Sequence, residues 1–350
     1  MLIRTVKNVK RAALVASAIA LAIGGQVALS GAAHAQSKKL VDVTFSLDFI
    51  VLGRHAPWYV ALEKGYYKQE GLNVKIIPGR GSAQVLQAVQ SGLAQIGFVD
   101  VPGIALARAS GSTIKIVAVN YQKAPYAVFT LSPGAAVMSA KQLEGLTLGS
   151  GAGSFTPKVI RGFMVQNGLD PNKLKIANVA PPARASMLLS RKVPAIEFFV
   201  MAQPGLEGGA KRAGAKLNTY LLGDHGLSLY SSGIGATEAY IKQNPKVMKA
   251  FVRASLRGWR DALRNPAEAA DLQRRHKAAL KKEIIIAELG VLKNLAVTPD
   301  TSKNGLGWFS PEKMRASLEF VKKYVGFKGK APEAKDIYAS GFLPAKPVLP

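Results

Sequence analysis

Residues 46–74 read SLDFIVLGRHAPWYVALEKGYYKQEGLNV and contain most of a strand–helix–strand unit. The segment 41–47 alternates in polarity and then becomes apolar, as strands do, whereas 57–67 has the periodicity of a helix. A second strand is predicted over 73–77. His55, one of four histidines in the chain, lies in the loop between the first strand and the helix. This unit favours an α/β fold.

The same alternation continues along the chain. Further strands are predicted over 95–99, 114–121, 146–149, 174–179, 193–200 and 216–222, and helices over 82–91, 104–110, 156–166 and 183–190. Ser82 and Thr156 are the expected N-caps of two helices. After 227–236 the chain is predicted to be mostly helical, with a loosely ordered tail beyond Val325. Regular alternation predicts a largely parallel sheet, with ligands at the carboxyl ends of its strands.

The N-terminus has the composition of an export signal. Residues 1–11 carry four basic residues and no acid, 12–29 are mostly apolar, and Ala33-His34-Ala35 supplies the small-x-small cleavage pattern. We expect residues 1–35 to be a Sec-type signal peptide cleaved near Ala35, which places the protein in the periplasm. An uncleaved anchor helix is the alternative. It is disfavoured because Gly24, Gly25 and Gln26 interrupt the apolar run, leaving it short of the roughly 20 residues that span a bilayer.

The composition limits the possible chemistry. The chain has no cysteine, so it can form neither a disulfide nor a thiolate metal site. Its net charge is +26, and four of these positive charges come from basic residues of the predicted signal peptide. Such a charge can indicate nucleic-acid binding, but no basic run is interleaved with aromatic residues as single-strand binding requires. We therefore expect no nucleic-acid partner, and the purpose of the charge stays open.

Part of the positive charge follows one helical periodicity within 245–265. The basic positions, at steps of three and four, are Lys246, Lys249, Arg253, Arg257, Arg260 and Arg264. The simplest interpretation is a solvated helix face. The alternative is loose contact with anionic lipid heads or with an acidic partner.

Three segments together resemble a known family. They are HAPWYVALEKGYYKQEGLNV (55–74), GRGSAQVLQAVQSGLAQIGFVD (79–100) and QLEGLTLGSGAGSFTPKVIRGFMVQNGLD (142–170). The chain resembles the solute-binding proteins of ABC importers in the nitrate, sulfonate and taurine group. Its pattern is most similar to the branch that binds pyrimidine precursors of thiamine. The phrase A-x-x-K-G-Y-Y-x-x-E-G-L is the most specific part of the likeness.

The resemblance implies a type 2 periplasmic-binding fold, in which two α/β lobes joined by a two-segment hinge close on a ligand. The crossings are expected near 128–133 and 223–230. Lobe 1 would then comprise 38–130 and 228–325, lobe 2 would comprise 131–227, and 326–350 would be a C-terminal tail. The implied function is the extracytoplasmic binding component of an ABC importer. It would act as a monomer and deliver solute to an inner-membrane permease with a cytoplasmic ATPase.

The resemblance also implies ligand-binding residues for a flat heterocycle. In the pyrimidine-binding branch a Trp follows the Asp after the first strand, and the matching residue here is Phe49. His55 matches a histidine before the first helix, and Glu197 resembles an acid that bonds ring nitrogens. Each has a structural alternative: His55 as a packed histidine, and Glu197 as the partner of a surface lysine. Val193-Pro194-Ala195 lacks the Asp usual at that site, so the ligand's identity stays open.

Two glycine-rich loops suit a different ligand, a small sulfonate or carboxylate. Gly79 to Ser82 and Gly149 to Ser154 each precede a predicted helix, whose free N–H groups attract anions. In sulfonate-binding relatives these loops hold the anionic head, which makes Ser82, Ser150 and Ser154 candidates and Arg80 a reinforcing charge. An ordinary flexible turn is the alternative interpretation of GSGAGS.

Two further candidates carry less weight. Asp100, which ends a predicted strand, is either an acid near the cleft or the cap of the next helix. Tyr230, after the second crossing, could form part of a cleft wall.

The resemblance leaves two other functions open. A fungal branch of the family synthesises the thiamine pyrimidine with a histidine, a pyridoxal-bearing lysine and iron beside a cysteine-rich run, but this chain has no cysteine. No HExxH or GxSxG motif is present, so we expect no catalytic residue, no cofactor and no metal. A sensor of the same fold that signals to a membrane kinase is the second alternative.

Overall fold

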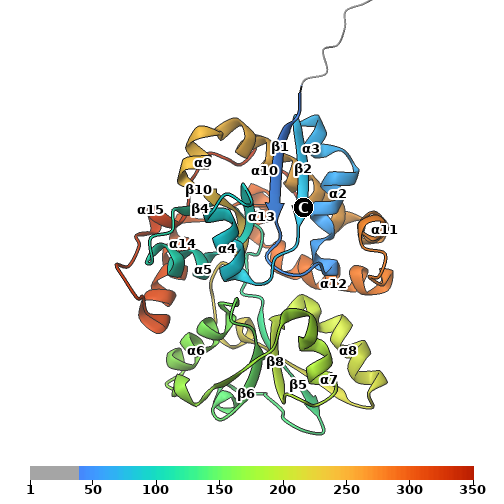
Figure 1. The fold of residues 1–350 in the computed structure, drawn as a ribbon, viewed down its shortest axis with the longest axis vertical. Helices are drawn as coiled ribbons and strands as arrows, with labels where there is room; N and C mark the ends of the chain where they lie inside the picture. Colours follow the sequence, from blue (N-terminus) through green and yellow to red (C-terminus); the bar gives the residue numbers. More distant parts are fainter. Residues whose placement is uncertain (1–38) are drawn as a thin grey trace, which may run out of the picture. The chain divides into compact units, whose positions relative to one another are not determined.

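The computed structural model describes residues 39–350, in which the chain forms two five-stranded sheets (Figure 1). The predicted signal peptide and its cleavage site lie outside the described residues. We call the first sheet with its helices, residues 40–119 and 232–350, the first lobe. Residues 126–221 form the second lobe. No helix among residues 39–350 is long and apolar enough to cross a membrane.

The first sheet has the strand order β2-β1-β3-β10-β4. Its strands are β1 (Val41–Ser46), β2 (Leu72–Ile77), β3 (Ile96–Asp100), β4 (Ile114–Val119) and β10 (Ser232–Thr237). The N-terminal part of this lobe adds η1 (Gly53–His55), α2 (Ala56–Glu63), α3 (Tyr66–Gln69), α4 (Ser82–Gln90) and α5 (Val101–Arg108). The C-terminal part adds α9 (Glu238–Gln243), α10 (Pro245–Arg264), α11 (Pro266–His276), α12 (Lys282–Ala296), α13 (Pro299–Asn304), α14 (Pro311–Phe320), η7 (Val321–Val325) and α15 (Ala334–Ile337).

The second sheet has the order β7-β6-β8-β5-β9. Its strands are β5 (Tyr126–Ser132), β6 (Thr147–Ser150), β7 (Lys175–Asn178), β8 (Ala195–Phe199) and β9 (Lys216–Leu221). Its helices are η2 (Ala140–Leu143), α6 (Thr156–Gln166), η3 (Pro171–Lys173), η4 (Pro181–Ala183), α7 (Arg184–Leu189), η5 (Val200–Ala202) and α8 (Gln203–Arg212). The short η6 (Leu222–His225) lies on the return to the first lobe.

Both sheets are mixed but largely parallel, as predicted: four strands of each run in one direction, and one strand that was not predicted to differ is antiparallel. In the first sheet β10 runs antiparallel to β3 and β4, and in the second β5 runs antiparallel to β8 and β9. In each case the antiparallel strand is the one that the chain forms directly after changing lobes. The parallel strands come from the strand–helix–strand units, in which each crossover returns the chain in the same direction.

The first crossing lies earlier than the predicted 128–133. Strand β5 pairs with β8 and β9 over its length, so the chain passes between the lobes within 120–125. The apolar run of β5 is buried at the centre of a sheet, where both neighbours satisfy its backbone groups. The return crossing, over 222–231, agrees with the predicted 223–230.

The tail after Val325 packs against the first lobe. This differs from the loosely ordered tail that the sequence predicts. Ile337 is fully buried, and Tyr338 forms a bridge with Ile116 of β4. Near the end of the chain, the Leu306 N–H donates to the carbonyl of Val348 at 2.8 Å. Apolar residues scattered through a Pro- and Gly-rich segment carry no periodicity, so their burial was not visible in the sequence.

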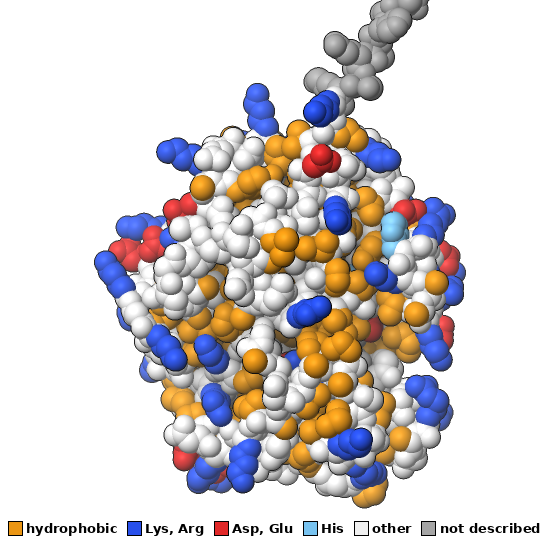
Figure 2. All heavy atoms as spheres, viewed as in Figure 1, with side chains coloured by type: hydrophobic (Ala, Val, Ile, Leu, Met, Phe, Trp, Pro, Cys, Tyr) orange, Lys and Arg blue, Asp and Glu red, His pale blue; other side chains and the backbone are white. Residues whose placement is uncertain are grey.

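At least half of the basic residues of the α10 stripe are engaged within the first lobe. Arg253 forms an ion pair with Glu70, Arg260 with Asp261, and the guanidinium of Arg257 stacks over the Tyr66 ring at 3.8 Å. On the face shown in Figure 2, basic side chains are spread out rather than gathered into one patch. These contacts account for half of the stripe without any external partner.

Candidate functional site

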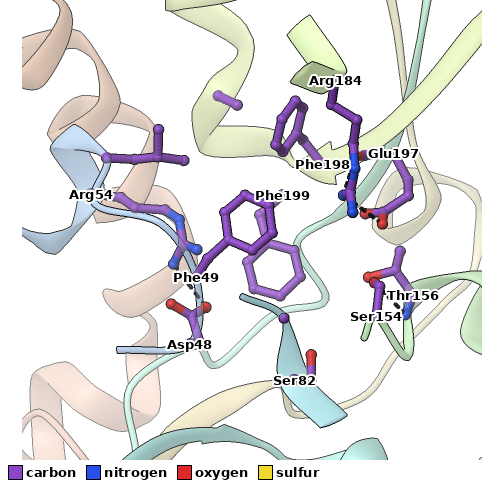
Figure 3. A pocket seen from close by; sticks show the side chains of 13 residues that line it. Asp48, Phe49, Arg54, Ser82, Ser154, Thr156, Arg184, Glu197, Phe198 and Phe199 are labelled. Carbon is purple, nitrogen blue, oxygen red and sulfur yellow. Dashed lines mark hydrogen bonds and ion pairs between the residues drawn. The ribbon is translucent and has the colours of Figure 1, made fainter. Parts of the chain in front are cut away.

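A narrow cavity of about 30 Å³ lies between the two lobes, at the carboxyl ends of β1 and β8 (Figure 3). Both lobes supply its walls. The first lobe contributes Asp48, Phe49, Leu52, Arg54, Gly81 and Ser82, and the second contributes Ser154, Thr156, Arg184, Glu197, Phe198, Phe199 and Ala202. The predicted candidates Phe49, Ser82, Ser154 and Glu197 are therefore brought together in one place.

The first-lobe wall is built around a buried ion pair. The Arg54 Nη1 donates to Asp48 Oδ2 and to the Tyr121 hydroxyl, each at 2.9 Å. Burial alone would raise the pKa of Asp48, but the Arg54 charge and the His55 hydrogen bond outweigh it and lower the pKa. Asp48 is therefore a fixed negative charge matched by a fixed positive one.

His55 lies behind this ion pair and does not line the cavity. Its side chain is fully buried, its Nδ1 accepts the Leu52 N–H at 3.0 Å, and its Nε2 lies 2.8 Å from Asp48 Oδ1. Since Nδ1 is an acceptor, the proton resides on Nε2, which donates to Asp48. Burial and the neighbouring Arg54 charge lower the pKa of His55 to about 4. The residue thus orients Asp48 as a neutral donor.

A buried carboxyl on α12 holds the backbone of the same loop. The Arg54 N–H donates to Glu288 Oε2 at 2.8 Å, across 234 positions of sequence. Burial raises the pKa of Glu288 to about 7, although hydrogen bonds from the backbone of Arg54 and Gly53 oppose the shift. Helix α12 thereby fixes the position from which the Arg54 side chain enters the cavity.

The second-lobe wall contains another buried ion pair. The Arg184 Nη1 donates to Glu197 Oε1 at 2.7 Å, and the Ser150 hydroxyl donates to the same oxygen at 2.7 Å. Ser150 is fully buried and supports Glu197 rather than lining the cavity. Burial raises the pKa of Glu197, and the Arg184 charge with nearby hydroxyls only partly offsets this rise.

Aromatic rings connect the two walls. The Phe49 and Phe198 rings meet edge to face across the cavity, with centroids 5.7 Å apart. Each arginine also stacks on a ring of the opposite lobe: Arg54 over Phe199 at 5.1 Å, and Arg184 over Phe49 at 5.4 Å. A flat ligand that enters between Phe49 and Phe198 must move them apart, and it then gains two aromatic contacts.

The two predicted anion loops contact each other. The Ala83 N–H donates to the carbonyl of Gly153 at 3.0 Å, so one of the first N–H groups of α4 is already used. The N-caps are Gly81 and Phe155, each one residue before the predicted Ser82 and Thr156. This shift leaves both hydroxyl-bearing side chains at the cavity wall. Arg80 is exposed and does not line the cavity.

Asp100 and Tyr230 lie away from the cavity. Asp100 is the N-cap of α5, accepting from the Gly103 N–H at 3.0 Å, and also accepts from the hydroxyls of Tyr126 and Ser231. It therefore adopts the capping alternative. The Tyr230 side chain is fully buried, and its hydroxyl accepts the Ser310 N–H at 3.0 Å.

Sequence reasoning missed most of the charged wall. Asp48, Arg54 and Arg184 were not among the candidates, and neither were Phe198 and Phe199. One signal was present: Asp48 and Arg54 are isolated charges in the otherwise apolar stretch 45–62, where burial without a partner would be costly. Arg184 has no comparable signal, because its partner becomes apparent only when α7 and β8 pack together.

Comparison with known proteins identifies the family. The family model described as NMT1/THI5 like matches residues 53–269. The chain belongs to the NMT1/THI5-like family. It is 28% identical over 316 residues to the riboflavin-binding protein RibY of Chloroflexus aurantiacus, covering 87% of each chain. It is 25% identical to the formylaminopyrimidine-binding protein of Halalkalibacterium halodurans, covering 67% of this chain and 70% of that one.

More distant relatives carry an enzyme's name. The 4-amino-5-hydroxymethyl-2-methylpyrimidine phosphate synthase of Candida albicans is 23% identical, over 65% of this chain and 69% of its own. Family membership alone therefore does not separate binding from synthesis.

Solved structures confirm the predicted fold. The alkanesulfonate-binding protein SsuA of Xanthomonas axonopodis pv. citri, solved with bound MOPS, matches with a TM-score of 0.66 at 13% identity. The match covers 88% of this chain and 100% of that one. The chain thus has the two-lobed α/β fold of periplasmic binding proteins, as the sequence resemblance implied.

Proposed function

We propose that this protein is the extracytoplasmic solute-binding component of an ABC importer. One observation carries the proposal: each lobe contributes an arginine–carboxylate pair and aromatic rings to a single cavity at the lobe boundary. A solute that contacts both walls binds the closed arrangement more tightly than an open one, and so shifts the population toward closure. The closed protein, acting as a monomer, delivers the solute to a membrane permease.

Export to the periplasm belongs to the same proposal. It is supported by the composition of residues 1–35 and by the periplasmic binding proteins that share the fold. A sensor of this fold would use the same cavity, and its distinguishing partner would be a kinase rather than a permease.

The cavity favours a flat, uncharged heterocycle over a small anion. Arg54 and Arg184 are each paired with a carboxylate, so the charges of the wall cancel. A small anion would have to displace one of these buried carboxylates, which costs free energy. A ring with both donors and acceptors on its edge would instead gain from charged partners on either side. Two relatives are named for ligands that contain such rings.

We further propose that the protein binds without chemistry. Both ring nitrogens of His55 are engaged inside the first lobe, so this histidine is not free to exchange a proton with a molecule in the cavity. The cysteine-rich run of the fungal synthases has no counterpart in this sequence.

The test is a titration of the purified protein by calorimetry, with riboflavin, an aminopyrimidine, an alkanesulfonate and nitrate. We expect one of the two heterocycles to bind at a single site, with an apparent stabilisation of about 2.7 kcal/mol at 100 times its dissociation constant. Phe49→Ala should weaken binding, whereas Leu93→Ala, a change of an exposed residue in the same lobe, should not.

Two results would contradict the proposal. Saturable binding of the sulfonate or nitrate alone would reject the heterocycle while keeping the binding function. Recovery of a chemically altered ligand after incubation would reject binding without chemistry.

A further inference from the structure

We propose a second ligand site, separate from the main cavity, that binds a small organic anion with an apolar body. It is a pocket of about 390 Å³ lined by residues of α5, α6, η3 and the segment 324–328. Its lining residues are Leu106, Ser110, Lys158, Arg161, Gly162, Val165, Pro171, Asn172, Tyr324, Val325, Gly326, Phe327 and Lys328. None of them lines the main cavity.

The charges of this second pocket all have one sign. Lys158, Arg161 and Lys328 line it, and no aspartate or glutamate is among its lining residues within the described chain. By contrast, each arginine of the main cavity has a carboxylate partner. No ion pair of these three cations is recorded within residues 39–350. The pocket therefore has an uncompensated positive potential that attracts an anion.

Arg161 offers an unused donor at this position. Its Nη2 donates to the carbonyl of Leu174 at 3.0 Å, which fixes the guanidinium. Its Nε is buried and has no hydrogen-bond partner among the described residues. A buried donor without a partner costs free energy, and a ligand oxygen would relieve that cost where a small shift of the Arg161 side chain opens Nε to the pocket.

The remaining walls indicate the body of the ligand. Leu106, Val165, Val325 and Phe327 are apolar, and Tyr324 adds an aromatic ring. Such a surface favours an alkyl or aryl group over a hydrated inorganic ion, because burying apolar surface releases water. A carboxylate, sulfonate or phosphate head next to a short apolar chain combines both requirements.

The test is a calorimetric titration of the purified protein with three probes. Octanoate has the anionic head and the apolar body, octanol has only the body, and sulfate has only the charge. We expect octanoate to bind at one site and to weaken as salt is raised, since exposed charges are screened. Octanol and sulfate should each bind at least about tenfold more weakly than octanoate, given the loss of charge pairs or of apolar burial.

Variants locate the site. The Lys158→Gln/Lys328→Gln double variant should weaken octanoate about tenfold, as expected for two partly exposed charge contacts. The matched control is Lys175→Gln/Lys192→Gln, which removes the same charge from exposed positions of the second lobe outside the pocket. Ser110→Trp, a change of an exposed residue at the pocket rim, should fill the space and abolish binding.

Four outcomes would overturn the proposal. Three of them are equal binding of octanol and octanoate, an equal loss in the control double variant, and octanoate binding that Phe49→Ala removes while the pocket variants do not. Binding to anionic lipid vesicles but not to free octanoate would also reject a small-molecule site. None of these outcomes depends on whether the main cavity binds a heterocycle.

Discussion

The two walls of the main cavity carry the same pair of groups in different electrostatic settings. In the first lobe Asp48 accepts from Arg54 and His55, and its pKa lies below the ordinary value. In the second lobe Glu197 accepts from Arg184 and Ser150, and its pKa lies above the ordinary value. The pKa of a buried carboxyl is lowered when its cationic and hydrogen-bonding partners outweigh the effect of burial, and raised when they do not. One wall is a fixed charge pair, whereas the other has an acid that takes up a proton more readily.

The largest expected effect comes from removing the arginine of each pair. Arg54→Met leaves Asp48 charged and buried, which should lower the free energy of unfolding by about 3–5 kcal/mol at pH 8. Arg184→Met should cost about 1–3 kcal/mol, because Glu197 can become protonated and remain hydrogen-bonded to Ser150. Urea denaturation of both variants measures the difference. Equal losses would mean that the two walls are electrostatically equivalent.

The next effect concerns Glu288, which fixes the first wall from behind. Its pKa of about 7 lies above the ordinary value of 4.5, so between these two pH values the folded state holds a proton that the unfolded state releases. Folding stability from this group is therefore present at low pH and lost as pH rises from about 4.5 to 7. Glu288→Gln removes the titration. The free energy of unfolding of this variant, relative to wild type, should increase by up to about 3 kcal/mol as the pH rises from 4.5 to 8.

His55 contributes a second pH dependence to folding stability, which must be considered together with that of Glu288. The pKa of His55 is about 4, below the ordinary value of 6.5, so its contribution to folding stability rises with pH from about 4 to 6.5, opposite in sign to that of Glu288. The two contributions oppose each other in wild type. In thermal denaturation between pH 4.5 and 8, the midpoint temperature should rise more steeply with pH in Glu288→Gln than in wild type. An unchanged pH profile would show that Glu288 is ionised throughout.

A smaller effect is expected where the two walls meet. Gly81 has φ of +122°, and a Cβ there would lie 2.4 Å from the Gly153 carbonyl oxygen of the other lobe. Gly81→Ala should cost at least about 1–2 kcal/mol through backbone strain. It should also hold the lobes apart, giving a larger radius of gyration by small-angle X-ray scattering. Gly92→Ala, with φ of +79° and no atom within 4 Å, should show strain alone. The same expansion in both variants would contradict a lobe contact at Gly81.

The smallest effect is expected from removing one of the two contacts in which an arginine stacks on a ring of the opposite lobe. Phe199→Leu removes the ring under Arg54 and should cost about 1 kcal/mol in unfolding free energy. Phe199→Tyr keeps the ring and should be close to wild type. Urea denaturation distinguishes the two, and a loss as large as that of Arg54→Met would show that stacking, rather than charge pairing, holds this wall.

Local patterns predicted much of the fold. Helix α6 has its predicted bounds, since Pro157 and an apolar stripe define it in the sequence. Helix α8 was not predicted, because three glycines in QPGLEGGAKR weaken its helix propensity and only packing stabilises it. Strand β5 was mistaken for a crossing because its partners β8 and β9 follow more than 60 positions later.

The cavity was predictable only in part. Phe49 and Glu197 were found because family resemblance marked their positions, and both line the cavity. Whether they bind a ligand stays a prediction. Arg184 depends on a contact between α7 and β8, and Phe199 on a contact between lobes, so neither leaves a local pattern. For His55 the sequence left open a ligand-binding role and a packed structural role, and its two hydrogen bonds hold it inside the first lobe.

The position of β10 also sets an order of assembly. This strand lies between β3 and β4, but the chain makes it only after the whole second lobe has been produced. The second lobe is continuous in sequence, so all five strands of its sheet lie within residues 126–221. The first lobe needs a strand beginning at Ser232 and closing contacts from the last residues of the polypeptide. Refolding should therefore show early protection from hydrogen exchange in β5–β9 and late protection in β3 and β4.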